Sequence, residues 1–444
     1  MVGTGALGDE AGDAMKVALW RAYADADKRW HTVAALGLRS IVAHAQHCGL
    51  DIDPVWCRTA ADLLHADADV FAISSVTAAW PQAKAAAEQL VALGQFVVLG
   101  GSHITCLPES LPRGCVGVLG EGEQTFADLL RIWLDDGEPG EAAGTVSWAG
   151  DVLRKSPPRP RIDLATAEHL PLYMAVGPDH LQAVATRGCC YRCWFCSASR
   201  CWSGKVTRFR PEWVAEQVGA YFAATREPGQ TVHVPKAQQP KQPGGVVTFQ
   251  DLHFASDPEW VGRCVAAMKA NGAPDKWHVA GCSYSAKLAK PELFAQLKSV
   301  GCEWLGIGIE SASPRILKKL KPHVTMADNE ALLQLGRDMQ IKICASFIVG
   351  TPGETEDDLK ATRDFIAKWT GPYFQQSGLF MFTPYPGTPC WDDLLAKGKV
   401  SPDMDFGLLT NGANPDRQRV FYCNPAMKLS TAVKWRQAIS RASR

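Results

Sequence analysis

With 444 residues, the chain is too long for one ordinary hydrophobic core, and we expect two domains and a C-terminal extension. Its 46 lysine and arginine residues balance its 46 aspartate and glutamate residues, so no charge excess indicates nucleic acid or an anionic membrane as a partner. No apolar run approaches the roughly 20 residues of a bilayer span, and residues 1–10 show no export signal, so we expect a cytoplasmic protein with a small-molecule substrate. Most of the 15 cysteines are then expected to be reduced thiols that pack as small apolar side chains.

Strands and helices alternate in residues 1–140, which we interpret as the first domain. The strands are expected at residues 16–20, 70–75, 96–99 and 116–119, and the helices at residues 32–47, 81–93 and 123–133. This alternation predicts an α/β fold with a doubly wound, Rossmann-like parallel sheet, in which ligands bind at the carboxyl ends of the strands. Gly100 and Gly101 follow such an end, where a missing side chain lets a ligand approach the backbone, although a tight turn explains them equally well. Three roles are open for His103: a ligand, a hydrogen-bonding partner, or a simple loop residue.

Residues 141–178 are rich in glycine, proline and polar side chains, which predicts a linker. The second domain, residues 179–395, again alternates between the two element types, with strands expected at residues 181–186, 246–249, 277–280, 304–309, 343–349 and 379–382. Repeated βα units predict a partial or full barrel with its active site at the C-terminal ends of the strands. Residues 226–245, poor in apolar side chains, are expected to form a loop, and residues 396–444 a small extension that ends in a helix at 432–439.

Cys189, Cys193 and Cys196 form a C-x3-C-x2-C pattern directly after an expected strand. Three thiolates so close in sequence can hold one iron–sulfur cluster, and three ligands to a four-iron cluster leave one iron open for another molecule. A zinc site is the main alternative, but structural zinc needs four ligands, and Cys190 is an awkward fourth because neighbouring residues on an extended loop point in different directions. The spacing therefore favours a cluster over zinc, with unliganded core cysteines as a third interpretation.

Other polar residues are expected at the same strand ends. Glu310 and Asp251 are acceptors suited to ribose hydroxyls or a substrate amine, and solvated loop carboxylates are the alternative. Arg187 and Arg192 flank the cysteines and would complement a negatively charged cluster. Two interpretations are open for Cys423, a contact to the active site and a buried structural thiol, and the second is favoured.

Four segments in the expected order resemble the radical S-adenosylmethionine superfamily. They are the cysteine pattern with the aromatic Phe195 before its last cysteine, residues 308–313, residues 347–354 and residues 385–389. The resemblance implies a [4Fe–4S] cluster on the three cysteines and S-adenosylmethionine at its open iron. It also implies cofactor-binding roles for Phe195, for Glu310 and Ser311 beside the ribose and methionine parts, and for Gly350 and Glu354 on the adenine side. An electron donor such as flavodoxin or ferredoxin is the implied protein partner.

The first domain is similar to the cobalamin-binding domain of B12-type members of that superfamily, through residues 100–103, 108–109 and 120–126. Gly100, Gly101 and Ser102 are then cobalamin-binding candidates. The Asp-x-His-x-x-Gly motif that supplies an axial histidine in many cobalamin proteins is missing, which implies binding without that ligand, or a vestigial domain that binds nothing. The resemblance implies C-methylation of a small molecule in specialised metabolism. The alternatives are ring rearrangement, cyclisation or 3-amino-3-carboxypropyl transfer, and, from another class, a non-catalytic zinc or iron–sulfur scaffold.

Overall fold

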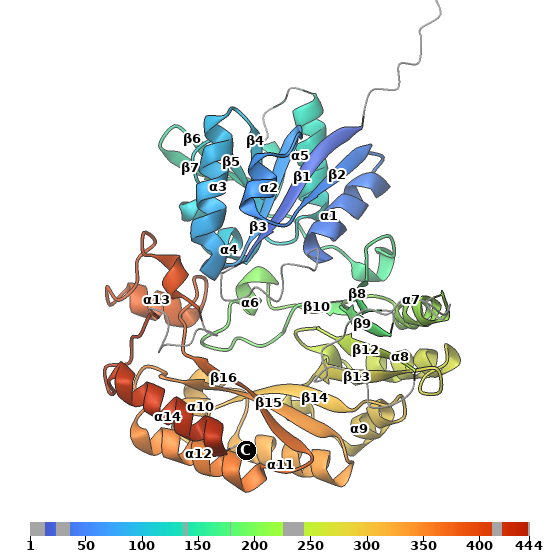
Figure 1. The fold of residues 1–444 in the computed structure, drawn as a ribbon, viewed down its shortest axis with the longest axis vertical. Coiled ribbons are helices and arrows are strands. Elements are labelled where there is room, and N and C mark those ends of the chain that lie inside the picture. The colour runs from blue at the N-terminus through green and yellow to red at the C-terminus, as the bar shows by residue number, and fades with distance from the viewer. Residues whose placement is uncertain are drawn as a thin grey trace, which may run out of the picture.

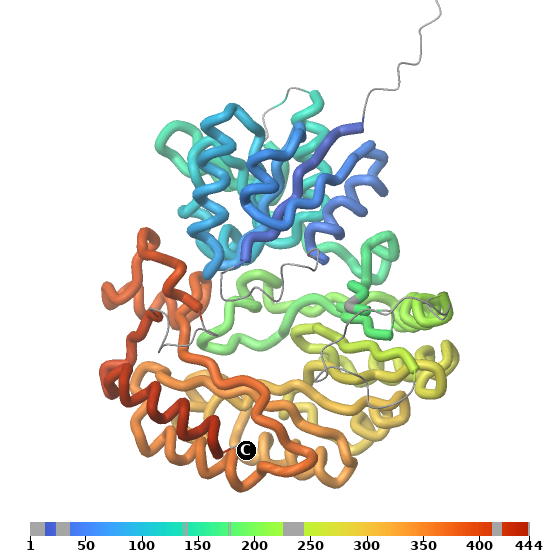
Figure 2. The backbone as a smooth tube through the Cα atoms, in the orientation of Figure 1, coloured from blue at the N-terminus to red at the C-terminus, as the bar shows by residue number. Residues whose placement is uncertain are grey.

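The computed structural model describes residues 14–23, 36–135, 137, 141–177, 179–224, 244–410 and 420–442. Two α/β units lie one above the other, and the chain crosses once from the first to the second (Figures 1 and 2). Most of the loop expected at residues 226–245, and the start of the helix expected at residue 32, lie outside the described residues.

The first unit is a seven-stranded sheet with helices on both faces. Its strands are β1 (Met15–Ala22), β2 (Ile52–Cys57), β3 (Val70–Ser75), β4 (Phe96–Gly100), β5 (Cys115–Val118), β6 (Thr145–Ala149) and β7 (Val152–Lys155). Its helices are α1 (Leu36–His47), α2 (Ala60–Leu64), α3 (Trp80–Ala92), α4 (Ser102–Cys106) and α5 (Glu123–Leu134). Alternate residues of β1 point to opposite faces: Val17 and Leu19 pack in the core under α1 and α5, whereas Ala18 and Trp20 pack under α2 and α3. The doubly wound fold is therefore confirmed.

The order of this sheet is β2-β1-β3-β4-β5-β6-β7, parallel from β2 to β5 and antiparallel beyond. The predicted linker was wrong in its first part, because the β6–β7 hairpin extends the sheet of the first unit. Its turn at Gly150 and Asp151 explains the glycine and polar content that suggested a linker. The segment that crosses to the second unit begins after Lys155.

The second unit is an open, curved sheet with helices on its outer side (Figure 1). Its strands are β8 (Tyr173–Gly177), β9 (His180–Ala183), β12 (Gly245–Phe249), β13 (Trp277–Ser283), β14 (Trp304–Glu310), β15 (Lys342–Val349) and β16 (Phe374–Met381). Its helices are α6 (Ala198–Cys201), α7 (Pro211–Ala224), α8 (Pro258–Ala270), α9 (Pro291–Lys298), α10 (Pro314–Leu320), α11 (Met326–Asp338), α12 (Glu356–Trp369), α13 (Pro389–Leu395) and α14 (Leu429–Ala442). The order is β16-β15-β14-β13-β12-β9-β8, and only β8 runs antiparallel to its neighbour. Because β16 and β8 are the two edges, the barrel is partial.

The two units share a hydrophobic core. Ile104 and Leu107 of the first unit belong to the same buried cluster as Leu320, Phe382 and Trp391 of the second. Burial of apolar surface across this boundary stabilises one arrangement of the two units. Among the helices of the described ranges, none combines the length and apolar character that a bilayer crossing requires.

Candidate active site

The loop that carries the three cysteines begins at a short antiparallel ribbon, in which β10 (Thr186–Arg187) pairs with β11 (Thr207–Arg208). Gly188 follows with φ of +102°, and a Cβ there would lie 2.0 Å from the carbonyl oxygen of Lys205, so only glycine fits. The buried carboxylate of Asp251 accepts the backbone N–H groups of Thr186 at 2.5 Å and Ala185 at 3.3 Å. Asp251 therefore positions the strand that leads into the cysteine loop, and it uses its acceptor oxygens to do so.

The thiols of Cys189, Cys193 and Cys196 are half-buried, whereas Cys190 is exposed. Burial raises the pKa of all three half-buried thiols, that of Cys193 to about 12, and the positive charge of Lys321 opposes this rise at Cys189 and Cys193. The Cys196 thiol already accepts the N–H of Ala198 at 3.5 Å. Burial favours the protonated form of these thiols. An iron–sulfur cluster would bind them as thiolates, with iron in the place of the protons, so a cluster fits the loop.

No group of three or more His, Cys, Asp or Glu side chains within the described ranges converges as the ligands of a single metal ion do. A four-iron cluster does not require such convergence, because each thiolate binds a different iron.

Glu310 ends strand β14 with its side chain turned back over the sheet. Its φ is +67°, which is rare for a residue other than glycine and is typical of strain held at functional sites. A Cβ at Gly308 would lie 1.9 Å from Glu310 Oε1, so this glycine makes room for the carboxylate. The Glu310 side chain is 10% exposed, its Oε1 lies 4.0 Å from Lys321 Nζ, and burial raises its pKa. A buried acceptor with one distant cation is suited to a hydrogen-bonding ligand.

Ser311 is fully buried, and its side chain contacts helix α12. Its hydroxyl lies 3.5 Å from the Thr362 hydroxyl of α12 and accepts the N–H of Ser313 at 3.2 Å. The structure thus favours a structural role for its side chain over the expected contact with a cofactor.

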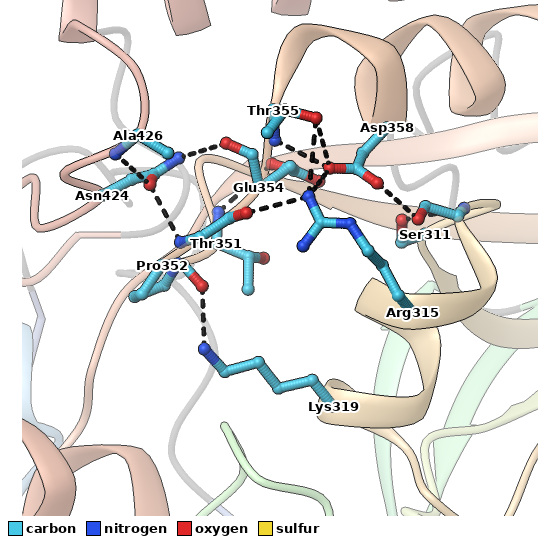
Figure 3. Close-up of polar contacts among 12 residues, drawn as sticks. Ser311, Arg315, Lys319, Thr351, Pro352, Glu354, Thr355, Asp358, Asn424 and Ala426 are labelled. Carbon is cyan, nitrogen blue, oxygen red and sulfur yellow. Dashed lines mark hydrogen bonds and ion pairs between the residues drawn. The ribbon is translucent and has the colours of Figure 1, made fainter.

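The segment after β15 is a tight turn closed by its own glutamate (Figure 3). Glu354 Oε2 accepts the N–H groups of Gly350 at 2.6 Å and Thr351 at 3.2 Å, while Oε1 is buried without a partner among the residues that the structure describes. Gly350 has φ of +86° and Gly353 has φ of +87°. Burial raises the pKa of Glu354 to about 8. Glu354 therefore shapes the turn. A Cβ at Gly350 would lie 3.0 Å from the ring of Tyr422, whereas a Cβ at Gly353 would meet no described atom within 4 Å.

The C-terminal segment holds this turn from outside, a contact that sequence reasoning missed. Asn424 Oδ1 accepts the N–H of Gly353 at 2.9 Å, and its Nδ2 donates to the carbonyl of Glu354 at 2.8 Å (Figure 3). Nearby, Cys423 is half-buried against the core that the two units share, and burial raises its pKa to about 12. These contacts fit the structural interpretation of Cys423.

Arg187 does not face the cysteines as expected. Its guanidinium lies 2.5 Å from Glu123 and 3.4 Å from Glu121, both from the first unit. Arg161 of the crossing segment also binds Glu121, at 3.1 Å. Two buried arginines are thus neutralised by two buried glutamates at the boundary, and the strand before the cysteines is fixed to the first unit.

The carboxyl edge of the first sheet faces the cysteine loop (Figure 1). Gly101 has φ of +98°, and a Cβ there would lie 2.5 Å from the carbonyl oxygen of Ser75, so the turn itself requires glycine. At Gly100 a Cβ would meet only Val118, at 4.0 Å, so this backbone is open to approach. Ser102 is the first residue of α4.

His103 is a buried core histidine. Its Nδ1 lies 3.2 Å from Thr77 Oγ1 and its Nε2 lies 3.0 Å from Ser110 Oγ. The ring stacks on Trp80 with centroids 4.4 Å apart, and burial lowers its pKa to about 3. Both ring nitrogens of His103 therefore have hydrogen-bond partners within the first unit.

Beside the cysteines lies a polar group that no sequence pattern indicated. Tyr191 stacks on His323 with centroids 3.8 Å apart and meets the edge of His253 at 5.2 Å. Within the described part of the chain, both ring nitrogens of His253 and Nε2 of His323 are buried without a hydrogen-bond partner. Only spatial proximity unites these residues, because they come from three loops far apart in the chain.

The family model of the radical SAM superfamily matches residues 184–366, which contain the cysteine loop, Glu310 and the Gly350–Glu354 turn. An uncharacterized methyltransferase of Pyrococcus horikoshii is 27% identical over 348 residues, which cover 74% of this chain and 70% of the relative. Bacteriochlorophyllide d C-12(1)-methyltransferase of Chlorobaculum tepidum is 27% identical over 330 residues, which cover 73% of this chain and 66% of the relative. The chain thus spans about two thirds of the length of these curated relatives.

Similarity of fold extends over both units. The solved structure of TsrM from Kitasatospora setae, a radical S-adenosylmethionine methyltransferase with cobalamin and a [4Fe–4S] cluster bound, superimposes with a TM-score of 0.70. The superposition covers 96% of this chain and 91% of that one, at 15% sequence identity. The arrangement of a Rossmann-like unit above a partial barrel is therefore shared along almost the whole chain.

Proposed function

Because the chain belongs to the radical SAM superfamily, whose members cleave S-adenosylmethionine at a [4Fe–4S] cluster, we propose that it is a cobalamin-dependent C-methyltransferase of a small molecule. The observation that carries the proposal is that the carboxyl edge of the Rossmann-like sheet faces the cysteine loop, with α4 against α6. The methyltransferase relatives and the shared fold support it. They favour it over a rearrangement, cyclisation or aminocarboxypropyl transfer and over a non-catalytic scaffold.

In this proposal, Cys189, Cys193 and Cys196 hold the cluster, and Glu310 accepts hydrogen bonds from S-adenosylmethionine. Lys321 keeps positive charge close to Glu310 and to the thiols. Glu354 shapes the turn that contains Gly350, and Asp251 holds the strand before the cysteines. When bound, the cluster supplies the electron that cleaves S-adenosylmethionine, and cobalamin supplies a methyl carrier.

Cobalamin is proposed to lie against Gly100, Gly101 and Ser102. The open backbone at Gly100 and the turn at Gly101 fit a flat, bulky group at the sheet edge. Since His103 is held by Thr77 and Ser110, binding takes place without an axial histidine. An external electron donor such as flavodoxin or ferredoxin completes the proposal.

The test is anaerobic reconstitution with iron and sulfide, with and without hydroxocobalamin, followed by gel filtration and a visible spectrum. Cobalamin that co-elutes with the protein supports the proposal. With reductant and a methyl-accepting substrate, S-adenosylhomocysteine and 5′-deoxyadenosine are both expected as products. Formation of 5′-deoxyadenosine without S-adenosylhomocysteine would exclude methyl transfer and leave only the radical SAM activity.

A further inference from the structure

Two cysteines from different units meet at the boundary. Cys106 is the last residue of α4 in the first unit, and Cys201 is the last residue of α6 in the second. Their sulfur atoms lie 3.5 Å apart although 95 residues separate them in sequence. A disulfide bond has a length of about 2.0 Å, so a small rotation of the side chains brings the sulfurs into bonding distance.

Local structure holds both thiols in place. Helix α4 is fixed by the Thr105 hydroxyl, which donates to the carbonyl of Gly101 at 2.9 Å. The other helix ends with the N–H of Cys201 donating to the carbonyl of Ser197 at 3.0 Å. Gly387, in the segment after β16, packs so closely that a Cβ there would lie 2.8 Å from the sulfur of Cys106. The pair is therefore a packed contact of three segments and not an encounter of exposed side chains.

The pair also connects the two proposed cofactor sites. Helix α4 begins at Ser102, directly after the glycines of the sheet edge. Helix α6 begins two residues after Cys196. A covalent bond between the ends of these helices would prevent the sheet edge from moving away from the cysteine loop.

We propose that Cys106 and Cys201 form a reversible disulfide that locks the two units together under oxidising conditions. The oxidant is a low-molecular-weight disulfide, of which glutathione disulfide is the example. One cysteine thiolate attacks this disulfide, and one small thiolate leaves. The second cysteine thiolate then attacks the mixed disulfide and displaces the second small thiol. The protein loses two electrons and two protons, and the small disulfide becomes two thiols.

Trypsin gives this proposal a direct readout. Cleavage after Lys84 and Arg113 releases residues 85–113, in which Cys106 is the only cysteine. Cleavage after Arg200 and Lys205 releases residues 201–205, in which Cys201 is the only cysteine. A disulfide between them yields one linked peptide, two hydrogens lighter than the sum of its parts, which disappears on reduction.

The experiment treats the anaerobic, cluster-reconstituted full chain with glutathione disulfide, blocks free thiols and maps the peptides by mass spectrometry. We expect the linked peptide in most of the wild-type protein, its loss in Cys106→Ser and in Cys201→Ser, and its retention in the control Cys57→Ser. In the wild-type protein, the short thiol cross-linker dibromobimane should join the same two peptides, which tests the proximity without any variant.

Three results would overturn the proposal. The first is that Cys106 and Cys201 are blocked as free thiols while Cys190 takes up glutathione. The second is that Cys201 is found linked to a cysteine of the cluster loop. The third is that the linked peptide appears only after the cluster iron is lost, since the lock would then not belong to the working protein. Because the linkage is read from peptides, it succeeds or fails independently of whether the enzyme methylates.

Discussion

Cys190 lies among the three proposed cluster ligands, yet its thiol is exposed while theirs are half-buried. The difference predicts opposite outcomes for two neighbouring substitutions. Cys193→Ala is expected to lose nearly all cluster iron, because a four-iron cluster with two protein thiolates is poorly held. Cys190→Ala is expected to keep wild-type iron and sulfide after anaerobic reconstitution, measured by iron and sulfide analysis. Loss of iron in Cys190→Ala would show that the ligand assignment is wrong.

Glu310 is the strongest candidate for direct contact with S-adenosylmethionine, because it is buried, strained and has only Lys321 as a distant partner. Glu310→Gln keeps the shape and removes the charge. Since a hydrogen bond to a charged group contributes about 1.5–3 kcal/mol, we expect the dissociation constant for S-adenosylmethionine to rise about tenfold or more. Equilibrium dialysis under anaerobic conditions measures it.

Ser311→Ala is the matched control for Glu310→Gln. Its hydroxyl is engaged with Thr362 and Ser313, so S-adenosylmethionine should bind the variant within about twofold of the wild type. If Ser311→Ala weakens binding while Glu310→Gln does not, the roles of the two residues are the reverse of those proposed.

The raised pKa of the Glu354 carboxyl predicts that the stability of the protein depends on pH. Burial raises its pKa from 4.5 to about 8 in the folded state. Between these two values the unfolded chain ionises and the folded carboxyl keeps its proton, so the free energy of unfolding falls as pH rises, by at most roughly 1.4 kcal/mol per pH unit. Glu354→Gln keeps an acceptor for Gly350 and Thr351 and cannot ionise. Urea unfolding at pH 5 and pH 8 should therefore show a smaller decrease for this variant than for the wild type, and an equal decrease would contradict the assignment.

At the scale of elements, buried strands were easier to predict than edge strands. The apolar run of β3 (Val70–Ser75) was predicted with its observed bounds, because a strand covered on both faces needs apolar residues throughout. The edge strand β2 was missed, since Asp53 and Pro54 interrupt its apolar pattern. The β6–β7 hairpin was interpreted as a linker for a similar reason. Its second strand, β7, is the exposed edge of the sheet, where the composition resembles that of a loop.

In the proposed site, the features that depend on neighbouring sequence positions were predictable, and the contacts between residues far apart in the chain were not. The cysteine spacing and Glu310 are local signals, and the sequence predicted both. The contact of Asn424 with the Gly350–Glu354 turn joins residues about 70 positions apart, and no periodicity reports such a pair. The stack of Tyr191 on His323 was invisible for the same reason.

The C-terminal segment is predicted to support the turn at Gly350 through Asn424. Asn424→Ala leaves the N–H of Gly353 and the buried carbonyl of Glu354 without these partners, which should destabilise the protein by about 1–3 kcal/mol. We also expect a weaker affinity for S-adenosylmethionine, because Gly350 lies in the same turn. Asn424→Asp still accepts from Gly353 and should recover part of the stability, measured by urea unfolding. Unchanged stability and affinity in Asn424→Ala would remove the segment from the site.

At the scale of the whole molecule, the two units meet through a mixed boundary. Apolar side chains from both enter one core, and the Arg187–Glu123–Glu121–Arg161 group lies beside it. Four largely buried charges that sum to zero contribute little net stability compared with apolar packing, and their contacts hold Arg187 beside Glu121 and Glu123 in the observed placement of the units. Since Arg187 directly precedes the cysteine loop, that placement also sets where the loop lies relative to the first sheet.

Removal of one charge from this group should therefore lower the free energy of unfolding strongly. Glu123→Gln leaves Arg187 buried with one carboxylate fewer at 2.5 Å, and the expected loss of stability is about 3 kcal/mol or more. The exposed ion pair of Lys155 and Glu109, with its charged atoms 2.9 Å apart, is the control. Lys155→Ala should lower the free energy of unfolding by less than about 1 kcal/mol, because water screens both charges. Urea unfolding measures both.

The double variant Arg187→Met/Glu123→Leu removes the unpaired charge and should recover much of the loss. If instead its loss of stability equals the sum of the losses in the single variants Arg187→Met and Glu123→Leu, the charges act independently, and apolar packing alone holds the cysteine loop against the first unit.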